Sequence, residues 1–181
     1  MKLPFYTIGH STRTVEELAA LLDAASVKVV VDIRTVPKSR TNPQFNADAL
    51  PANLEPYGID YERIAALGGL RGKSKDIAPD VNGFWENQSF HNYADYALTE
   101  GFHDGIDQLI KLGRKKRCAV MCSEAVWWRC HRRIVADYLL ARGETVFHLM
   151  GDDRIEEAHL TQGASVQSPH AVLYPAETPQ A

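Results

Sequence analysis

Hydrophobic and polar residues follow one another along the first part of the chain in a pattern that predicts a strand, a helix and a second strand. An apolar run covers residues 3–11. Residues 14–25 then carry leucines at helical spacing, and Thr14 with Glu17 fits a capping box at the start of that helix. Residues 27–34 are almost continuously apolar and β-branched, which is typical of a buried parallel strand. Together these segments predict a β-α-β unit.

The middle of the chain is less regular. Residues 35–46 form a polar loop that contains two prolines, and residues 47–58 indicate a short or broken helical segment. A strand over residues 59–67 is expected to lead into a glycine-rich basic loop at residues 68–76. Residues 77–92 have no strong periodicity and indicate an insertion.

Helical periodicity returns over residues 93–113, where Gly101 and Gly105 are candidate interruptions. A strand over residues 117–124 follows, and residues 131–151 indicate a helix and then a further strand. Alternating strands and helices predict the α/β class. We expect a single-domain, three-layer structure with a mostly parallel sheet and helices on both faces.

The length and charge of the chain limit the classes of protein to which it can belong. Its 181 residues suit one domain with a sizeable core, which we expect over residues 1–155, with a partly flexible C-terminal extension over residues 156–181. Hydrophobic residues make up 45% of the chain and charged residues 24%, as in ordinary globular proteins. The formal net charge of -3 gives no support to nucleic acid or to a membrane surface as a partner, so any basic site must be local. The oligomeric state is not predicted.

Several features favour a cytoplasmic protein. The N-terminal residues contain no long apolar stretch, so they make a poor export signal. No segment is apolar enough to cross a membrane. Cysteine occurs three times, an odd number, and reduced thiols are the simplest expectation.

Polar and reactive residues gather at the ends of the predicted strands. In open α/β sheets, ligands bind beyond the carboxyl ends of the strands, so we expect these residues to share one site. They are His10, Ser11, Asp32, Arg34, the loop from Gly68 to Arg71, Cys122 and Glu124.

Cys122, Cys130 and His131 supply thiolate and imidazole groups, which are ligands of zinc. Their spacing, C-x7-C-H, is not that of a zinc finger, and a structural zinc site needs four ligands. Further ligands would have to come from distant residues such as His10 or His148. We therefore predict no metal, with a Cys/His metalloprotein as an alternative.

A cysteine nucleophile needs positive charge or a helix N-terminus to lower the pKa of its thiol. Cys130 begins a predicted helix that continues with His131 and two arginines, and Cys122 ends a strand. This order is similar to the anion cradle of cysteine phosphatases and sulfurtransferases, although Cys122 and Arg129 are spaced C-x6-R rather than C-x5-R. The alternative is that the cysteines are small buried hydrophobes, which we expect of Cys118 inside its strand.

Arginines gather in the predicted loops and helix starts, where they suit bidentate capture of phosphate or carboxylate. Alternatively, they form a solvated basic face that pairs with nearby carboxylates. His10 and His131 are the histidines best placed for proton transfer, or else they form buried hydrogen bonds. Trp127 or Trp128 would stack on a base or ring, or pack into the core. The arginines are Arg34, Arg40, Arg71, Arg129, Arg132 and Arg133.

Several motifs together resemble the family known as domain of unknown function 488. They are TIGHS at 7–11, DIR at 32–34, PKSR at 37–40, LGGLRG at 67–72 and CSEAVWWRCHRR at 122–133. The resemblance covers about residues 5–150 and implies a compact α/β domain with a shared site, but no reaction. The site positions that it implies are His10, Ser11, Asp32, Arg34, Ser39, Arg40, Gly68, Gly69, Arg71, Cys122, Glu124, Cys130, His131 and Arg132.

Two hypotheses of function follow. The first is an enzyme that acts, without a cofactor, on a small anionic substrate of phosphate-like or nucleotide-like chemistry. Cys122 or Cys130 would be its nucleophile, and proton transfer would fall to Glu124, His131 or His10. The second is a module that binds an anion or nucleic acid without catalysis. In either case we expect the ligand to contact Ser11, Asp32, Arg34, Ser39, Arg40, Gly69, Arg71, Trp128 and Arg132.

Overall fold

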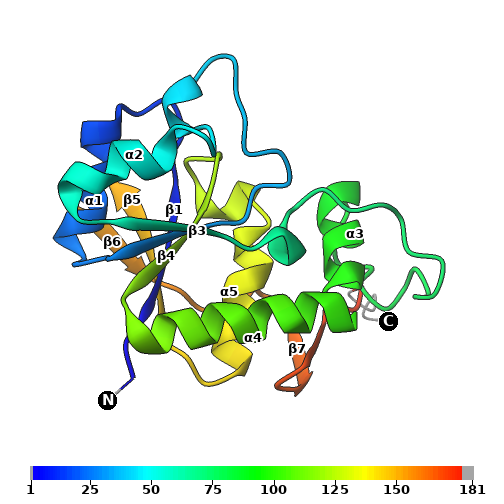
Figure 1. Cartoon of the computed structure of the whole chain (residues 1–181). Coiled ribbons are helices and arrows are strands. Elements are labelled where there is room, and N and C mark those ends of the chain that lie inside the picture. Colours follow the sequence, from blue (N-terminus) through cyan, green and yellow to red (C-terminus); the bar gives the residue numbers. More distant parts are fainter. Residues whose placement is uncertain (1, 177–181) are drawn as a thin grey trace.

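A six-stranded sheet with the order β3-β2-β4-β1-β5-β6 forms the centre of the molecule (Figure 1). The computed structural model describes residues 2–176. The first five strands run parallel, and β6 runs antiparallel to β5. The predicted α/β class with a mostly parallel sheet is therefore confirmed. The strands are β1 (Phe5–Gly9), β2 (Val29–Asp32), β3 (Asp60–Arg63), β4 (Cys118–Cys122), β5 (Val146–Gly151) and β6 (Arg154–Glu157).

Helices cover both faces of this sheet because buried side chains alternate along its strands. Val30 points to one face, where it packs with α1 and α2. Val29 and Val31 point to the other face, where they pack with α3, α4 and α5. The helices are α1 (Val15–Ala24), α2 (Leu50–Leu54), α3 (Gln88–Tyr96), α4 (Glu100–Lys115) and α5 (Arg132–Ala141). Single 3-10 turns are η1 (Pro43–Phe45), η2 (Glu55–Tyr57), η3 (Ala65–Leu67) and η4 (Trp127–Arg129).

The first helix begins where its capping box predicts. The Thr14 hydroxyl accepts a hydrogen bond from the Glu17 amide at 3.1 Å, and the Glu17 carboxylate accepts one from the Thr14 amide at 2.9 Å. These two bonds satisfy backbone donors that the helix itself cannot pair. This end of α1 follows the carboxyl end of β1 after a short connection.

The long helical pattern in the second half of the chain is interrupted at a different place from the one predicted. The break lies between α3 and α4, where the Thr99 hydroxyl caps α4 by accepting from the Phe102 amide. Gly101 and Gly105 lie inside α4 and do not interrupt it. Gly105 instead allows close packing, because an added Cβ would lie 3.0 Å from Leu67 Cδ2.

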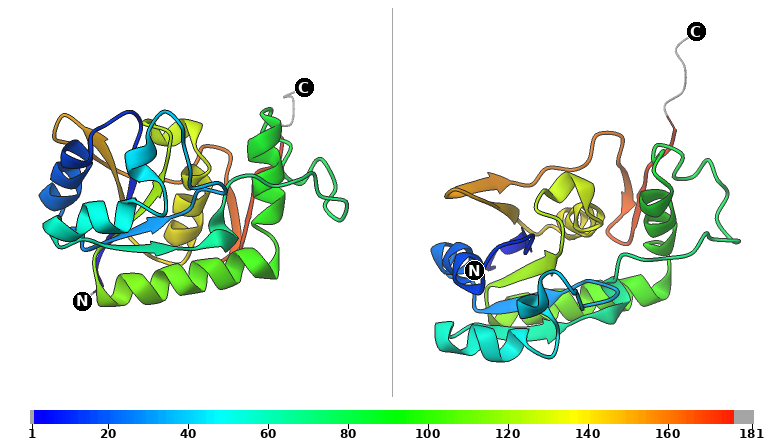
Figure 2. Two further views of the ribbon diagram at one scale, coloured as in Figure 1. Left: turned by 45° about the horizontal axis from the view of Figure 1, so that its top comes forward. Right: turned by 90° about the horizontal axis from the view of Figure 1, so that it is seen from above.

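The C-terminal segment packs on the domain through β7 (Ser165–Ser168) and β8 (Ala171–Leu173), which form a hairpin beside α3 and α5 (Figure 2). Val172 and Tyr174 are fully buried, and the Tyr174 hydroxyl donates to Asp137 of α5 at 2.8 Å. The last residues of the extension, 177–181, lie outside the described part of the chain. No helix among residues 2–176 is both long and apolar enough to cross a membrane.

Candidate functional site

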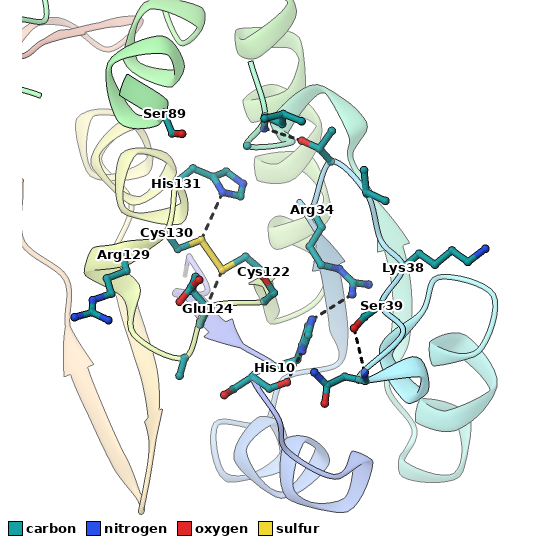
Figure 3. A pocket seen from close by; sticks show the side chains of 18 of the residues that line it. His10, Arg34, Lys38, Ser39, Ser89, Cys122, Glu124, Arg129, Cys130 and His131 are labelled. Carbon is teal, nitrogen blue, oxygen red and sulfur yellow. Dashed lines mark hydrogen bonds between the residues drawn. A yellow bond between two sulfur atoms is a disulfide. The ribbon is translucent and has the colours of Figure 1, made fainter. Parts of the chain in front are cut away.

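A pocket of about 910 Å³ opens at the carboxyl ends of β1, β2 and β4 (Figure 3). His10 follows β1, Arg34 follows β2 and Cys122 ends β4, so three strands each place a side chain in its wall. The starts of α3 and α5 add Ser89 and His131. The location is the one at which open parallel sheets bind ligands.

Cys122 and Cys130 both line the pocket and are joined as a disulfide, which corrects the expectation of reduced thiols. Cys122 is the last residue of β4, and Cys130 lies immediately after the turn η4. The short connection between them folds back, so residues at the two ends of the loop meet. Cys118 is the free cysteine of the described residues, and its burial raises the pKa of its thiol to about 12. It packs in the core as predicted.

Arg132 is fully buried directly behind Cys122. Its Nη1 lies 2.8 Å from Cys122 Sγ and donates to the Glu124 carbonyl at 2.7 Å, while Nη2 donates to the Ala125 carbonyl. Among residues 2–176, no carboxylate forms an ion pair with this guanidinium. Burial lowers the pKa of Arg132 to about 9, because the charge has lost its water. A buried cation without a counter-charge is costly, and a Cys122 thiolate, formed once the disulfide is reduced, would supply that charge.

His131 faces the second cysteine in a defined tautomer. Its Nε2 is 2.8 Å from the Ile33 carbonyl, which can only accept, so Nε2 carries the proton. Burial lowers the pKa of His131 to about 4, so the ring is neutral near pH 7 and Nδ1 holds a lone pair. That Nδ1 lies 3.5 Å from Cys130 Sγ. Gly69 makes room for the ring, because an added Cβ would lie 2.5 Å from Nδ1.

His10 and Arg34 form a hydrogen-bonded pair in the opposite wall. Arg34 donates through Nε and Nη2 to the carboxylate of Asp32 at 2.9 and 2.6 Å, and through Nη2 to the Phe45 carbonyl at 2.7 Å. Its Nη1 lies 3.2 Å from His10 Nε2, which must therefore accept. His10 Nδ1 then donates to the Ser11 carbonyl, and burial lowers the pKa of the ring.

Both nitrogens of His10 are thus engaged, and the ring acts to orient Arg34. A guanidinium has five N–H groups. The four hydrogen bonds to Asp32, Phe45 and His10 leave one N–H of Arg34 Nη1 available on the pocket side.

Two further cations lie in the pocket wall. Lys38 comes from the loop after β2, and Arg129 comes from the turn η4 (Figure 3). Neither forms an ion pair within the described part of the chain. Arg34 is neutralised by Asp32, so Lys38 and Arg129 carry the unpaired positive charges of a pocket whose lining also includes the acidic residue Glu124.

The family model that matches this chain is "Domain of unknown function DUF488", which matches residues 14–139. This match covers more than half of the chain. The chain belongs to the DUF488 family. The resemblance carried by the motifs of the sequence is thereby confirmed. No curated protein and no solved structure matches the chain significantly.

The structure brings most of the site residues predicted for this DUF488 domain into one place. The pocket is lined by His10, Ser11, Arg34, Ser39, Gly69, Cys122, Glu124, Cys130 and His131. No group of three or more metal-ligating side chains occurs within residues 2–176.

Six other predicted residues of the DUF488 domain do not line the pocket. The Asp32 carboxylate accepts a hydrogen bond from Arg34, and the Arg132 guanidinium contacts Cys122 Sγ. Asp32 and Arg132 can therefore influence the pocket only through Arg34 and Cys122. The Arg71 guanidinium lies over the Tyr96 ring at 3.8 Å. The remaining three are Arg40, Gly68 and Trp128.

Some pocket residues of the DUF488 domain were not among those predicted. Asn87, Ser89 and Phe90 come from the start of α3, inside the segment without periodicity, so no pattern marked them. Lys38 lies within the PKSR motif, whose other polar residues were predicted. Arg129 is one of the arginines that the sequence suggests for anion capture, and the turn η4 places it in the pocket wall.

Proposed function

We propose that this protein is a cysteine-dependent enzyme that acts on a small anionic substrate, with Cys122 as its nucleophile. The observation that carries this proposal is the contact between the buried guanidinium of Arg132 and Cys122 Sγ at 2.8 Å. A cation beside a thiol lowers the pKa of the thiol because it stabilises the thiolate. Once the disulfide is reduced, the Cys122 thiolate is the anion that this guanidinium lacks.

The charges of the pocket support an anionic substrate. Lys38 and Arg129 present two unpaired positive charges against the one carboxylate of Glu124, and Arg34 Nη1 presents an N–H group. The backbone at the start of α5 adds its partial positive charge, which favours anions. A negatively charged molecule would therefore be drawn into the pocket between these groups, where Cys122 lies.

The chemical step follows from these positions. The Cys122 thiolate attacks an electrophilic atom of the bound anion, a bond from Cys122 Sγ to that atom forms, and the bond to the leaving group breaks. The leaving group departs with the electron pair of that bond. His131 and His10 are neutral and hydrogen-bonded, so they are poor acids near pH 7. Glu124, whose carboxylate lines the pocket, is the group assigned to proton transfer.

The proposal is tested by two alkylating agents that differ in charge, iodoacetate and iodoacetamide, on the reduced protein. Peptide mass spectrometry measures the rate at Cys122 for each agent. We expect Cys122 to react faster than free cysteine and to prefer iodoacetate relative to free cysteine. The double variant Lys38→Gln, Arg129→Gln is expected to lose that preference. The matched control Lys111→Gln, Lys115→Gln removes two lysines of α4, outside the pocket, and is expected to keep it.

The two parts of the proposal fail separately in this experiment. A Cys122 that reacts no faster than free cysteine contradicts the nucleophile. A preference for iodoacetate that both double variants share contradicts the anion pocket.

A second candidate is an anion-binding module without catalysis. It is favoured by the bridged state of Cys122 and Cys130, in which neither sulfur is a nucleophile. The two candidates predict different effects of reducing the Cys122–Cys130 disulfide. An enzyme gains thiol reactivity at Cys122 on reduction, whereas a binding module keeps the same affinity for inorganic phosphate in both states.

A further inference from the structure

The pocket contains a second cysteine, Cys130, whose thiol can attack the sulfur of the first cysteine when that sulfur carries a bound group. Cys130 Sγ is paired with Cys122 Sγ as a disulfide, so the loop between the two cysteines brings the Cys130 thiol within reach of its partner. When a second thiol attacks the sulfur of the first, the group on that sulfur must leave with the bonding electrons. Phosphoryl and acyl groups do not leave from sulfur in this way, but thiolates do.

The two cysteines also have different surroundings. Cys122 Sγ meets a guanidinium, which stabilises the thiolate that makes the first attack. Cys130 Sγ accepts from the Arg132 amide at 3.4 Å and faces the unprotonated Nδ1 of His131 at 3.5 Å. A Cys130 thiol can donate its hydrogen to this lone pair, which keeps it in place as the second reactant.

We infer that the pocket reduces anionic small-molecule disulfides, with Cys122 as the attacking thiol and Cys130 as the resolving thiol. This inference rests on the proposed function of Cys122. In the first step the Cys122 thiolate attacks one sulfur of the substrate, a mixed disulfide forms, and the other half leaves as a thiolate. In the second step Cys130 attacks Cys122 Sγ, the Cys122–Cys130 bond forms, the bond to the second half breaks, and that half leaves with the electron pair and takes up the proton of Cys130 to become a thiol.

Atoms and electrons balance over these two steps. The protein dithiol loses two electrons and becomes the disulfide, and the substrate disulfide gains them and becomes two thiols. A dithiol reductant then returns the protein to its reduced state for another turnover. The pocket, at about 910 Å³, has room for a disulfide whose two ends carry carboxylates. Lys38 and Arg129, whose charged ends extend outward on opposite sides of the site in Figure 3, are the cations that such carboxylates would meet at the rim.

The test uses the reduced full-length protein, freed of reductant, with glutathione disulfide as the anionic probe and cystamine as a cationic probe. We expect the wild-type protein to release both halves of glutathione disulfide as thiols and to end as the Cys122–Cys130 disulfide. The rate with glutathione disulfide is expected to exceed that with cystamine by a factor on the order of ten, because the charged pocket steers the anion. Cys130→Ser is expected to release only one half and to retain the other on Cys122.

The outcomes separate this inference from the proposed function. A Cys122 that is alkylated rapidly, in a protein that retains a stable mixed disulfide or ignores glutathione disulfide, overturns the inference and leaves the nucleophile intact. A faster reaction with cystamine overturns the anionic substrate class. A Cys122 unreactive toward every probe overturns both. The wild-type stoichiometry needs no variant, so poor folding of Cys130→Ser would not prevent a decision.

Discussion

The guanidinium of Arg132 lies 2.8 Å from the sulfur of Cys122, and both groups are buried at the carboxyl end of the sheet. The cation comes from the first residue of α5, and the thiol comes from the last residue of β4. The loop between β4 and α5 thus brings a cation and a thiol into direct contact. This contact should lower the pKa of the Cys122 thiol, because the guanidinium stabilises the thiolate.

Arg132→Met tests this relationship by removing the charge and keeping most of the side-chain volume. In the reduced protein, the thiol pKa of Cys122 should rise, and alkylation at pH 7 should slow by roughly tenfold for each unit of that rise. In the disulfide-bridged protein, where this buried charge has no counter-charge, its removal should offset the lost hydrogen bonds to the loop, so urea unfolding should change little. Arg133→Met is the control, since Arg133 points to Thr161 and should leave the rate unchanged. Equal slowing in both variants would contradict the account.

Gly69→Ala tests the packing of His131. An added Cβ would lie 2.5 Å from the imidazole Nδ1, so the ring or the backbone at residue 69 must shift, which disturbs the contact of Nδ1 with Cys130 Sγ. We expect a loss of about 1–3 kcal/mol in the free energy of unfolding, and slower closure of the Cys122–Cys130 disulfide. Gly72→Ala is the matched control, because an added Cβ there meets no atom within 4 Å. Urea denaturation and thiol titration measure the two effects.

The pH dependence of stability should report the buried imidazole of His148. Burial lowers the pKa of His148 to about 4, from about 6.5 in the unfolded chain. The unfolded state therefore binds more protons in this window, so the stabilising contribution is complete above pH 6.5 and is lost as the pH falls toward 4. Asp137 opposes this slope, since burial raises the pKa of its carboxyl to about 6.

His148→Gln isolates the contribution of His148 from the opposing effect of Asp137 and from the parallel effect of His131, whose pKa burial also lowers to about 4. The substitution should flatten the decline in the free energy of unfolding between pH 6.5 and 4 relative to the wild-type protein. His159→Gln changes an exposed histidine and should leave the decline as it is. Urea denaturation at a series of pH values measures all three proteins. An unaltered slope in His148→Gln would show that the ring is not held neutral.

Asp32→Asn tests the pair that orients Arg34. Asp32 is fully buried and receives two hydrogen bonds from the guanidinium, so its loss leaves a buried cation unpaired. Breaking a buried pair from one side costs about 3–5 kcal/mol. Asp60→Asn is the control, because the Asp60–Lys116 pair is exposed and such pairs contribute about 0–1 kcal/mol. Chemical denaturation that gives equal losses would contradict the structural role of Asp32.

The sequence was sufficient to predict the layered fold because its strands and helices differ in periodicity. Residues 27–34 and 117–124 are apolar runs, and they became the central strands β2 and β4. The carboxyl ends of parallel strands meet at one edge, so His10, Arg34 and Cys122 could be grouped without coordinates. The break between α3 and α4 was misplaced because a glycine that packs closely and a glycine that ends a helix look the same in sequence.

The rest of the site depends on contacts that no local pattern encodes. The loop from Cys122 to Cys130 brings its two ends together, and a spacing of residues does not determine whether two cysteines meet. Arg71 was placed correctly in a loop, but its side chain turns to Tyr96. Ser89 reaches the pocket from a segment that shows no periodicity before α3 begins.

The most direct test of the central claim is the thiol pKa of Cys122, measured from the pH dependence of iodoacetamide alkylation in reduced Cys130→Ser. The account predicts a pKa clearly below the ordinary cysteine value of about 8.5, and a return toward that value when Arg132→Met is added. A Cys122 pKa at or above the ordinary value, unchanged by Arg132→Met, would contradict it.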